Sequence, residues 1–219
     1  TPIVATLVAA LHENGRRLPR SKTGIYEERF TLLFREWDDV RDVANRNRVD
    51  ERDKWVLLAR LALQMHRDRR QRFTRCELED LWHEGFADVY PDVQTDDLLW
   101  ELRVYNSVVV QEIGGAYSLG HLSYQEFLAA KGIVIGQYWH DLAERVHESW
   151  WRNTLVFYAG LAGDVGQLFD LVQRKHGLDQ TGGLVAEMLA EARYTSAVVK
   201  DVVGEILEEE VDAGEEEIL

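Results

Sequence analysis

Apolar residues recur at α-helical spacing along most of this chain, and this feature constrains its fold more than any other. Between residues 22 and 40 they fall three and four positions apart, at Tyr26, Phe30, Leu33, Trp37 and Val40. Residues with this spacing lie on one face of a helix. Only three prolines, at positions 2, 19 and 91, interrupt helix formation. The pattern therefore predicts a mainly α-helical fold.

The composition is that of an ordinary globular protein. The chain has 219 residues, 46% of them hydrophobic and 29% charged, which suits one fair-sized domain or two small ones. No apolar run approaches the roughly 18 residues that a membrane helix needs, and no signal peptide opens the chain. We therefore expect a cytoplasmic protein that spans no membrane. Because the chain opens without Met in the middle of an apolar pattern, we interpret it as a piece of a longer protein.

The cysteine and histidine residues are placed in a way that argues against a metal site. Cys76 is the sole cysteine, which excludes a disulfide framework and a cysteine-rich zinc site. His66, His83, His140 and His147 are scattered and form no His-x-x-x-His pair. We expect no metal ion to be bound by this chain.

The net charge of −14 is concentrated near one end of the chain. Eight of the 39 acidic residues lie within residues 205–219, a segment without Lys or Arg that we interpret as a solvated acidic tail. The remainder is mildly acidic, which does not favour long-range attraction to nucleic acid. The sequence has one run of basic residues, which contains Arg67, Arg69, Arg70, Arg72 and Arg75. Its simplest interpretation is a solvated connector between two helices. Contact with nucleic-acid phosphates or with acidic partners stays open as an alternative.

The middle of the chain has the element order of a winged helix. Thr74 and Glu77 match a capping box at the start of the second helix of this region. Gly114-Gly115 lies between two β-rich runs, which is typical of a hairpin. The expected elements are helices over 51–66, from 74 to 86 and from 95 to 105, and strands within 108–113 and 116–119.

A second capping box follows the hairpin. We expect Ser123 as the N-cap and Glu126 as its partner three residues later. His121 then lies just outside a helix N-terminus, where free amide groups and the helix dipole favour an anion. Further helices are predicted as two antiparallel pairs, 150–163 with 165–175 and 184–193 with 195–209.

A segment of twelve residues at the end of the hairpin resembles part of a known family. Residues 119–130 read LGHLSYQEFLAA, which resembles the His-(Leu/Thr)-(Ser/Thr)-Phe-Gln-Glu-(Phe/Tyr)-Leu-Ala-Ala segment of NACHT-domain proteins, within the STAND class of signalling NTPases. Residues 1–7, TPIVATL, are similar to the Asn-Pro-Leu-Leu-Leu-Thr-Leu segment of that family's small helical domain. Residues 18–27 are similar to its Leu-Pro…Leu-Tyr-Glu continuation. The resemblance covers residues 1–135, in the family's order.

Pattern and resemblance together predict a mainly α protein. It would contain a helical domain fragment, a winged helix with a small β-hairpin, and paired antiparallel helices. We place the end of a NACHT-associated small helical domain at residues 1–45 and the winged helix at 50–136. Helices of a helical-array type would occupy 137–204, followed by the acidic tail at 205–219.

The nucleotide-hydrolysing motifs of the family do not occur in this sequence. It contains no Gly-x-x-x-x-Gly-Lys-(Ser/Thr) loop and no Walker B acidic run after a hydrophobic strand. Both would lie upstream in the family's order. We therefore expect no catalytic residue and no ATP hydrolysis from this segment alone. The resemblance implies that the parent protein is an ATPase and that an upstream domain holds most of the ADP or ATP.

The resemblance implies a nucleotide contact for two residues. In the family, a histidine at the place of His121 reaches from the winged helix to the β-phosphate of bound ADP and holds a closed state. A proline at the place of Pro2 packs near the adenine. Carried over to this chain, His121 is a sensor of the nucleotide state and Pro2 is a wall for the base.

The function implied by the resemblance is regulation of a NACHT ATPase, through opening and oligomerisation in signalling or anti-phage defence. The partners would be the upstream nucleotide-binding domain and, after activation, further copies of the protein. Two alternatives stay open. One is a winged-helix regulator that binds nucleic acid through the Arg67–Arg75 run, although Asp96, Asp97 and Glu101 make its third helix unsuited to phosphates. The other is a structural interaction module in which His121 is inert.

Overall fold

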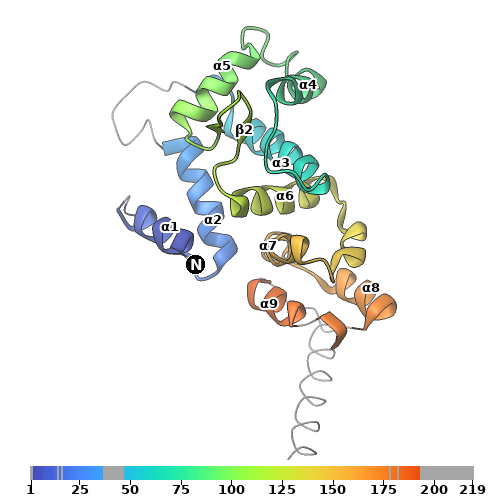
Figure 1. Ribbon diagram of the computed structural model, residues 1–219. Coiled ribbons are helices and arrows are strands. Elements are labelled where there is room, and N and C mark those ends of the chain that lie inside the picture. Colours follow the sequence, from blue (N-terminus) through green and yellow to red (C-terminus); the bar gives the residue numbers. More distant parts are fainter. Residues whose placement is uncertain are drawn as a thin grey trace, which may run out of the picture.

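The structure is a computed structural model that describes residues 2–13, 15, 17–36, 47–177, 179–181 and 183–192. These residues form a mainly helical fold with a short antiparallel hairpin (Figure 1), which confirms the predicted fold class. The α-helices are α1 (Pro2–Glu13), α2 (Lys22–Thr31), α3 (Glu51–Arg67), α4 (Arg75–Gly85), α5 (Thr95–Trp100), α6 (Leu122–Gly136), α7 (Arg152–Ala162), α8 (Gly166–His176) and α9 (Leu184–Glu191). The shorter elements are the π-helical turns η1 (Leu32–Glu36) and η3 (Glu101–Tyr105), the 3-10 turns η4 (Trp139–Arg145), η5 (Ser149–Trp151) and η6 (Asp179–Thr181), and the strands β1 (Val110–Gln111) and β2 (Tyr117–Ser118).

Helix α2 and its continuation η1 carry the apolar stripe that the sequence indicates. Tyr26, Phe30 and Leu33 are all buried, as residues on the inner face of an amphipathic helix should be. The last two members of the stripe, Trp37 and Val40, lie outside the described residues. The described part of the stripe therefore confirms the predicted helix and its buried face.

The central part of the chain forms the predicted winged helix. Helices α3, α4 and α5–η3 follow in the predicted order, and the hairpin comes after them. Gly114 and Gly115 have φ angles of +92° and +83° in the hairpin turn, a backbone region in which glycine has no steric penalty. Phe73, between α3 and α4, pairs with Tyr117 of β2 and so adds a one-residue third strand. The hairpin register places Val110 opposite Ser118 and Gln111 opposite Tyr117.

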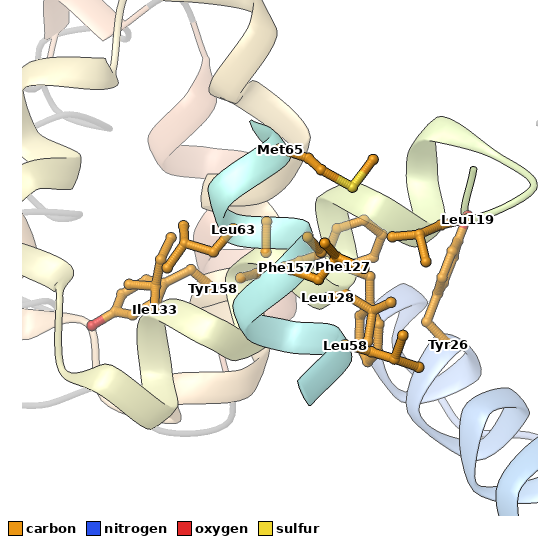
Figure 2. Close-up of a cluster of buried hydrophobic side chains, with 14 of the residues drawn as sticks. Tyr26, Leu58, Leu63, Met65, Leu119, Phe127, Leu128, Ile133, Phe157 and Tyr158 are labelled. Atoms are coloured by element: carbon orange, nitrogen blue, oxygen red, sulfur yellow. The ribbon is translucent and has the colours of Figure 1, made fainter. Parts of the chain in front are cut away.

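Helix α6 lies at the centre of the core, with α3 packed on one side and α7 on another. Figure 2 shows side chains from α2, α3, α6 and α7 meeting in this core, among them Tyr26, Phe127 and Phe157. Gly132 allows the close approach of α3, because a Cβ atom there would lie 2.6 Å from the carbonyl oxygen of Ala59. The winged helix and the helices that follow it thus share one connected apolar core.

Three of the four helices predicted after the winged helix, α7, α8 and α9, form where the sequence predicts them, but their packing differs in one respect. Helix α7 packs against α6 and α9, whereas α8 packs mainly against η4 rather than along α7. The 3-10 turn η4 was not predicted, and its buried Leu142 and Ala143 supply apolar surface near α8. Asp164 lies just before α8, and its Oδ1 accepts a hydrogen bond from the Gly166 amide at 2.9 Å.

Helix α9, the last described helix, is hydrogen-bonded to α2. The Glu191 carboxylate of α9 accepts hydrogen bonds from the Lys22 and Thr23 amides of α2, at 2.9 and 2.7 Å. First-turn amides have no partner within their own helix, and a carboxylate there also interacts favourably with the helix dipole. This contact joins α9 to α2 across 168 residues. The predicted helix over 195–209 and the acidic tail at 205–219 lie outside the described residues.

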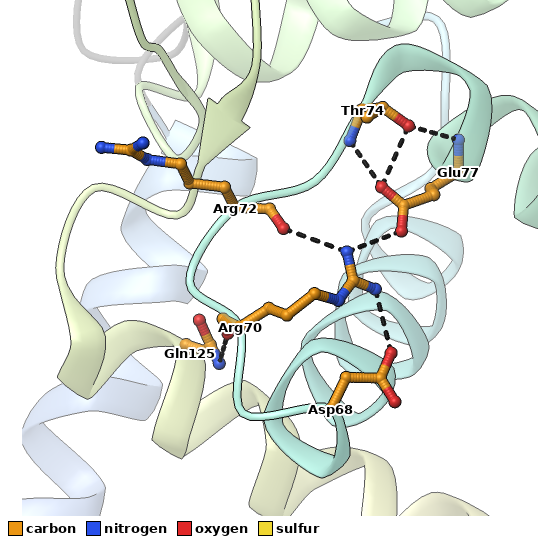
Figure 3. Close-up of polar contacts among 6 residues, drawn as sticks. All are labelled: Asp68, Arg70, Arg72, Thr74, Glu77 and Gln125. Carbon is orange, nitrogen blue, oxygen red and sulfur yellow. Dashed lines mark hydrogen bonds and ion pairs between the residues drawn. The ribbon is translucent and has the colours of Figure 1, made fainter.

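The predicted capping box of α4 is confirmed. Thr74 Oγ1 accepts from the Glu77 amide at 3.2 Å, and Glu77 Oε2 accepts from the Thr74 amide at 2.7 Å. Arg70 adds an ion pair to Glu77 at 2.7 Å, as Figure 3 shows. Burial opposes ionisation of Glu77, but the hydrogen bonds from Thr74 and Arg70 outweigh it and lower the pKa of Glu77.

Replacing Thr74 with Ala should lower the free energy of unfolding by about 1 kcal/mol, because the Glu77 amide loses its acceptor at the start of α4. Urea denaturation of the two proteins would measure the loss. Thr74→Ser is the matched control, since serine keeps the capping hydroxyl. Equal stability of the Ala and Ser variants would contradict the role of this cap.

Within the part of the chain that the structure describes, no helix is long and apolar enough to cross a membrane. The same residues contain no group of three or more His, Cys, Asp or Glu side chains arranged to hold a metal ion.

Candidate functional site

The candidate site lies where the hairpin ends and α6 begins. Leu119 is buried against the core and Gly120 has a φ angle of +76°, so the chain turns sharply into α6. His121 follows in an extended conformation, with φ −139° and ψ 142°. Its Nδ1 accepts a hydrogen bond from the Ser123 amide at 3.1 Å and lies 2.7 Å from Ser123 Oγ. His121 is therefore itself the N-cap of α6.

The sequence-based assignment of Ser123 as the N-cap, with Glu126 as its capping-box partner, was wrong. Ser123 lies inside the first turn of α6, and its amide donates to His121. The Glu126 carboxylate accepts instead from Asn153 Nδ2 of α7, at 3.2 Å. Burial raises the pKa of Glu126, against the opposing effects of this hydrogen bond and of the Lys22 charge. The pattern misled because an imidazole Nδ1 can replace a serine oxygen as the capping acceptor.

The amides at the start of α6 are less available to an anion than the sequence indicated. The amides of Tyr124 and Gln125 donate to the His121 carbonyl oxygen, at 2.9 and 3.4 Å. The Ser123 amide donates to the His121 ring. Three amides at the start of α6 are therefore already occupied by acceptors of this chain.

The cap determines which nitrogen of His121 carries the ring proton. A backbone amide can only donate, so the Nδ1 atom that faces the Ser123 amide must present its lone pair. In the neutral ring the proton is then on Nε2. His121 is exposed, and within the described residues its Nε2 makes no hydrogen bond. The ring thus offers an oriented N–H donor to an acceptor outside the domain.

Tyr26 of α2 lies in the core next to the start of α6. Burial raises the pKa of Tyr26, against the opposing effect of Ser123. The Tyr26 ring packs against Phe127 and Phe157, with ring centroids 5.7 and 4.8 Å apart. Tyr26 thus packs α2 against α6 and α7 close to the start of α6.

An open pocket of roughly 130 Å³ adjoins His121, between the hairpin and the loop that precedes Phe73. One cationic side chain, Arg72, lines it. The sequence could not single out Arg72, because five arginines share its run. The lining residues are Gln71, Arg72, Glu112, Ser118, Leu119, Gly120, His121, Leu122 and Gln125.

Ion pairs distinguish Arg72 from the other arginines of the run. Arg67, Arg69, Arg70 and Arg75 each have a carboxylate partner within 4 Å. Arg72 is exposed and has no such partner among the described residues. The run is a solvent-exposed connection between α3 and α4, in which four of the five arginines also pair with carboxylates of this chain.

The other predicted site residue is not brought near His121 by any described contact. Pro2 begins α1, and its side chain lies outside the described residues. Its role beside an adenine remains a prediction.

The match to a known family covers this site. The sequence profile of the winged helix-turn-helix domain C-terminal to NACHT matches residues 22–133, which run from the start of α2 into α6 and include the hairpin and His121. No curated protein and no solved structure matches the chain. The matched residues make up more than half of the chain, and their helices and hairpin have the order of a winged helix. The chain belongs to the family of winged helix-turn-helix domains that lie C-terminal to NACHT.

Proposed function

We propose that this regulatory domain senses the nucleotide held by the upstream NACHT domain of its parent chain, with His121 as the contact. The observation that supports this most is the capped imidazole, whose Nδ1 is occupied by the Ser123 amide. Its exposed Nε2–H donates to the β-phosphate of ADP in the closed state. Pro2, at the start of α1, would pack beside the adenine.

The size of this contact suits a switch. A hydrogen bond to a charged phosphate is worth about 1.5–3 kcal/mol, which shifts an equilibrium by about 10- to 100-fold. Loss of the contact when ADP leaves or ATP arrives would release the domain. Release would expose surfaces for oligomerisation, in signalling or anti-phage defence.

Replacing His121 with Ser in the full parent chain should speed ADP release by about 10- to 100-fold, because the phosphate loses its donor. Release is measured by loading labelled ADP, adding excess unlabelled ADP and counting retained label over time. Serine is a good N-cap, so this variant separates phosphate contact from helix capping. His121→Ala removes both, and it should also cost about 1 kcal/mol of stability.

The matched control is His83→Ser, which replaces an exposed histidine of α4 and should leave ADP release unchanged. Equal release rates for wild type and His121→Ser would exclude the sensor role while leaving the fold intact. In that case His121 would be a helix cap alone.

The charge distribution gives little support to the alternative nucleic-acid regulator. Asp96 and Asp97 of α5 pair with Arg75 and Arg48, so these arginines face carboxylates of this chain. Glu101, expected on the surface of this helix, is buried. A winged helix that reads DNA needs cations along this helix. Salt-dependent duplex binding by the purified chain would be the result that favours this alternative.

A further inference from the structure

We propose that Arg72 is a second phosphate-contacting residue and that it acts on the same terminal phosphate group as His121. This inference rests on the proposed function, because the nucleotide of the upstream domain supplies the phosphate. The two side chains come from different elements, the loop before Phe73 and the start of α6, and line one pocket.

The backbone that carries Arg72 is held firmly, while its side chain is left free. Gln125 of α6, 2% exposed, donates from Nε2 to the Arg70 carbonyl oxygen at 2.7 Å. Arg70 donates to the Arg72 carbonyl oxygen at 3.3 Å, and it pairs with Asp68 and Glu77. Figure 3 shows the Arg72 side chain directed away from this network. The loop is thus built to position a guanidinium that it does not itself neutralise.

A guanidinium and an imidazole that line the same pocket are suited to one chemical class of ligand. Arginine presents several N–H donors in a plane, which match the oxygens of a phosphate group. His121 provides one further donor. Glu112 also lines the pocket, but its Oε1 accepts from Ser118 Oγ at 2.7 Å, and no ion pair joins it to Arg72. Two donors of this kind would hold a terminal phosphate from two directions.

The test compares three variants of the full parent chain in the labelled-ADP release assay. Arg72→Gln should speed release roughly 10-fold or more, because a charge-assisted hydrogen bond is lost. The rate of ADP release from Arg72→Lys should fall between the rates for wild type and Arg72→Gln, since lysine keeps the charge without the planar donor set. Arg67→Gln is the matched control, because Arg67 belongs to the same run but lies outside this pocket. The thermal stability of Arg72→Gln should equal that of wild type, because this side chain makes no ion pair with any residue that the structure describes.

Each outcome decides a separate point. Faster release in Arg72→Gln but not in Arg67→Gln supports the proposal. Unchanged release in Arg72→Gln, with faster release in His121→Ser, would overturn this inference and leave the proposed function standing. Equal acceleration in both arginine variants would indicate a long-range charge effect and would also overturn it. Unchanged release in Arg72→Gln and His121→Ser alike, or a wild-type parent that retains no nucleotide, would remove both proposals.

Discussion

Replacing Lys54 with Met should lower the free energy of unfolding by about 3–5 kcal/mol, because it leaves a buried carboxylate without its partner. Lys54 of α3 and Glu101 of η3 form an ion pair of 2.5 Å, with side chains only 0% and 2% exposed. A charge that loses its partner in such a place keeps its full cost of desolvation.

Further polar groups surround this pair. Lys54 Nζ also donates to Asn47 Oδ1 at 2.6 Å, and Glu101 Oε2 accepts from the Arg48 amide at 2.8 Å. Asn106 Nδ2 donates to the Leu33 carbonyl oxygen at 2.9 Å. The network thus links the segment before α3 to η1 and η3, so its loss should loosen the junction between α2–η1 and the winged helix.

Guanidinium denaturation of the 219-residue chain would measure the free energy of unfolding that Lys54→Met loses. The double variant Lys54→Met, Glu101→Leu should recover most of the stability, because replacing both charges with apolar groups is often neutral or better. Arg60→Met is the matched control, since the Arg60–Glu84 pair is exposed and worth about 1 kcal/mol or less. If Lys54→Met lowered the free energy of unfolding as little as Arg60→Met does, the stabilising role of the buried ion pair would be contradicted.

Acidification should destabilise the protein through His66. This residue at the end of α3 is fully buried, and its Nε2 lies 3.0 Å from Thr154 Oγ1 of α7. Its ring stacks on Trp150, with centroids 4.8 Å apart, and its Nδ1 is buried with no hydrogen-bond partner among the described residues. Burial lowers the pKa of His66 from 6.5 to about 4; the Trp150 backbone opposes this shift, and the Arg69 charge adds to it.

The direction of the effect follows from proton binding. Between pH 6.5 and 4 the unfolded chain binds a proton at His66 that the folded chain does not, so stability falls as the pH falls. The contribution is complete above pH 6.5 and is lost progressively towards pH 4. At pH 5 the loss from this one residue should be about 2 kcal/mol.

Comparison with His66→Gln isolates this contribution, because glutamine does not titrate and all other groups are shared. The stability advantage of wild type over this variant should shrink by about 2 kcal/mol between pH 7.5 and 5, as measured by urea denaturation. A difference between wild type and His66→Gln that stays constant from pH 7.5 to 5 would show that the burial of His66 does not control its protonation.

Local pattern was sufficient for most of the secondary structure. The spacing of Tyr26, Phe30 and Leu33 predicts α2 and its buried face, and Gly114-Gly115 predicts the hairpin turn. The Thr74 capping box also follows from sequence, because all of its partners lie within four residues. Interactions of such short range depend little on the rest of the fold.

Residues distant in the sequence decided the remaining features. Glu126 could have completed a capping box, but Asn153 of α7 binds it, and His121 caps α6 instead. Lys54 and Glu101 are of residue types that are mostly exposed, yet both are buried and pair with each other.

By itself, the sequence determined a mainly helical chain with a winged helix and drew attention to His121, because helical periods, turn glycines and capping residues act over a few positions. Only the tertiary structure decided which nitrogen of His121 is free and that Arg72 lies in the same pocket. The same structure showed that the other arginines of the run are already paired. Such facts depend on which carboxylates and amides the folded chain brings within hydrogen-bond distance, and no local pattern encodes that distance.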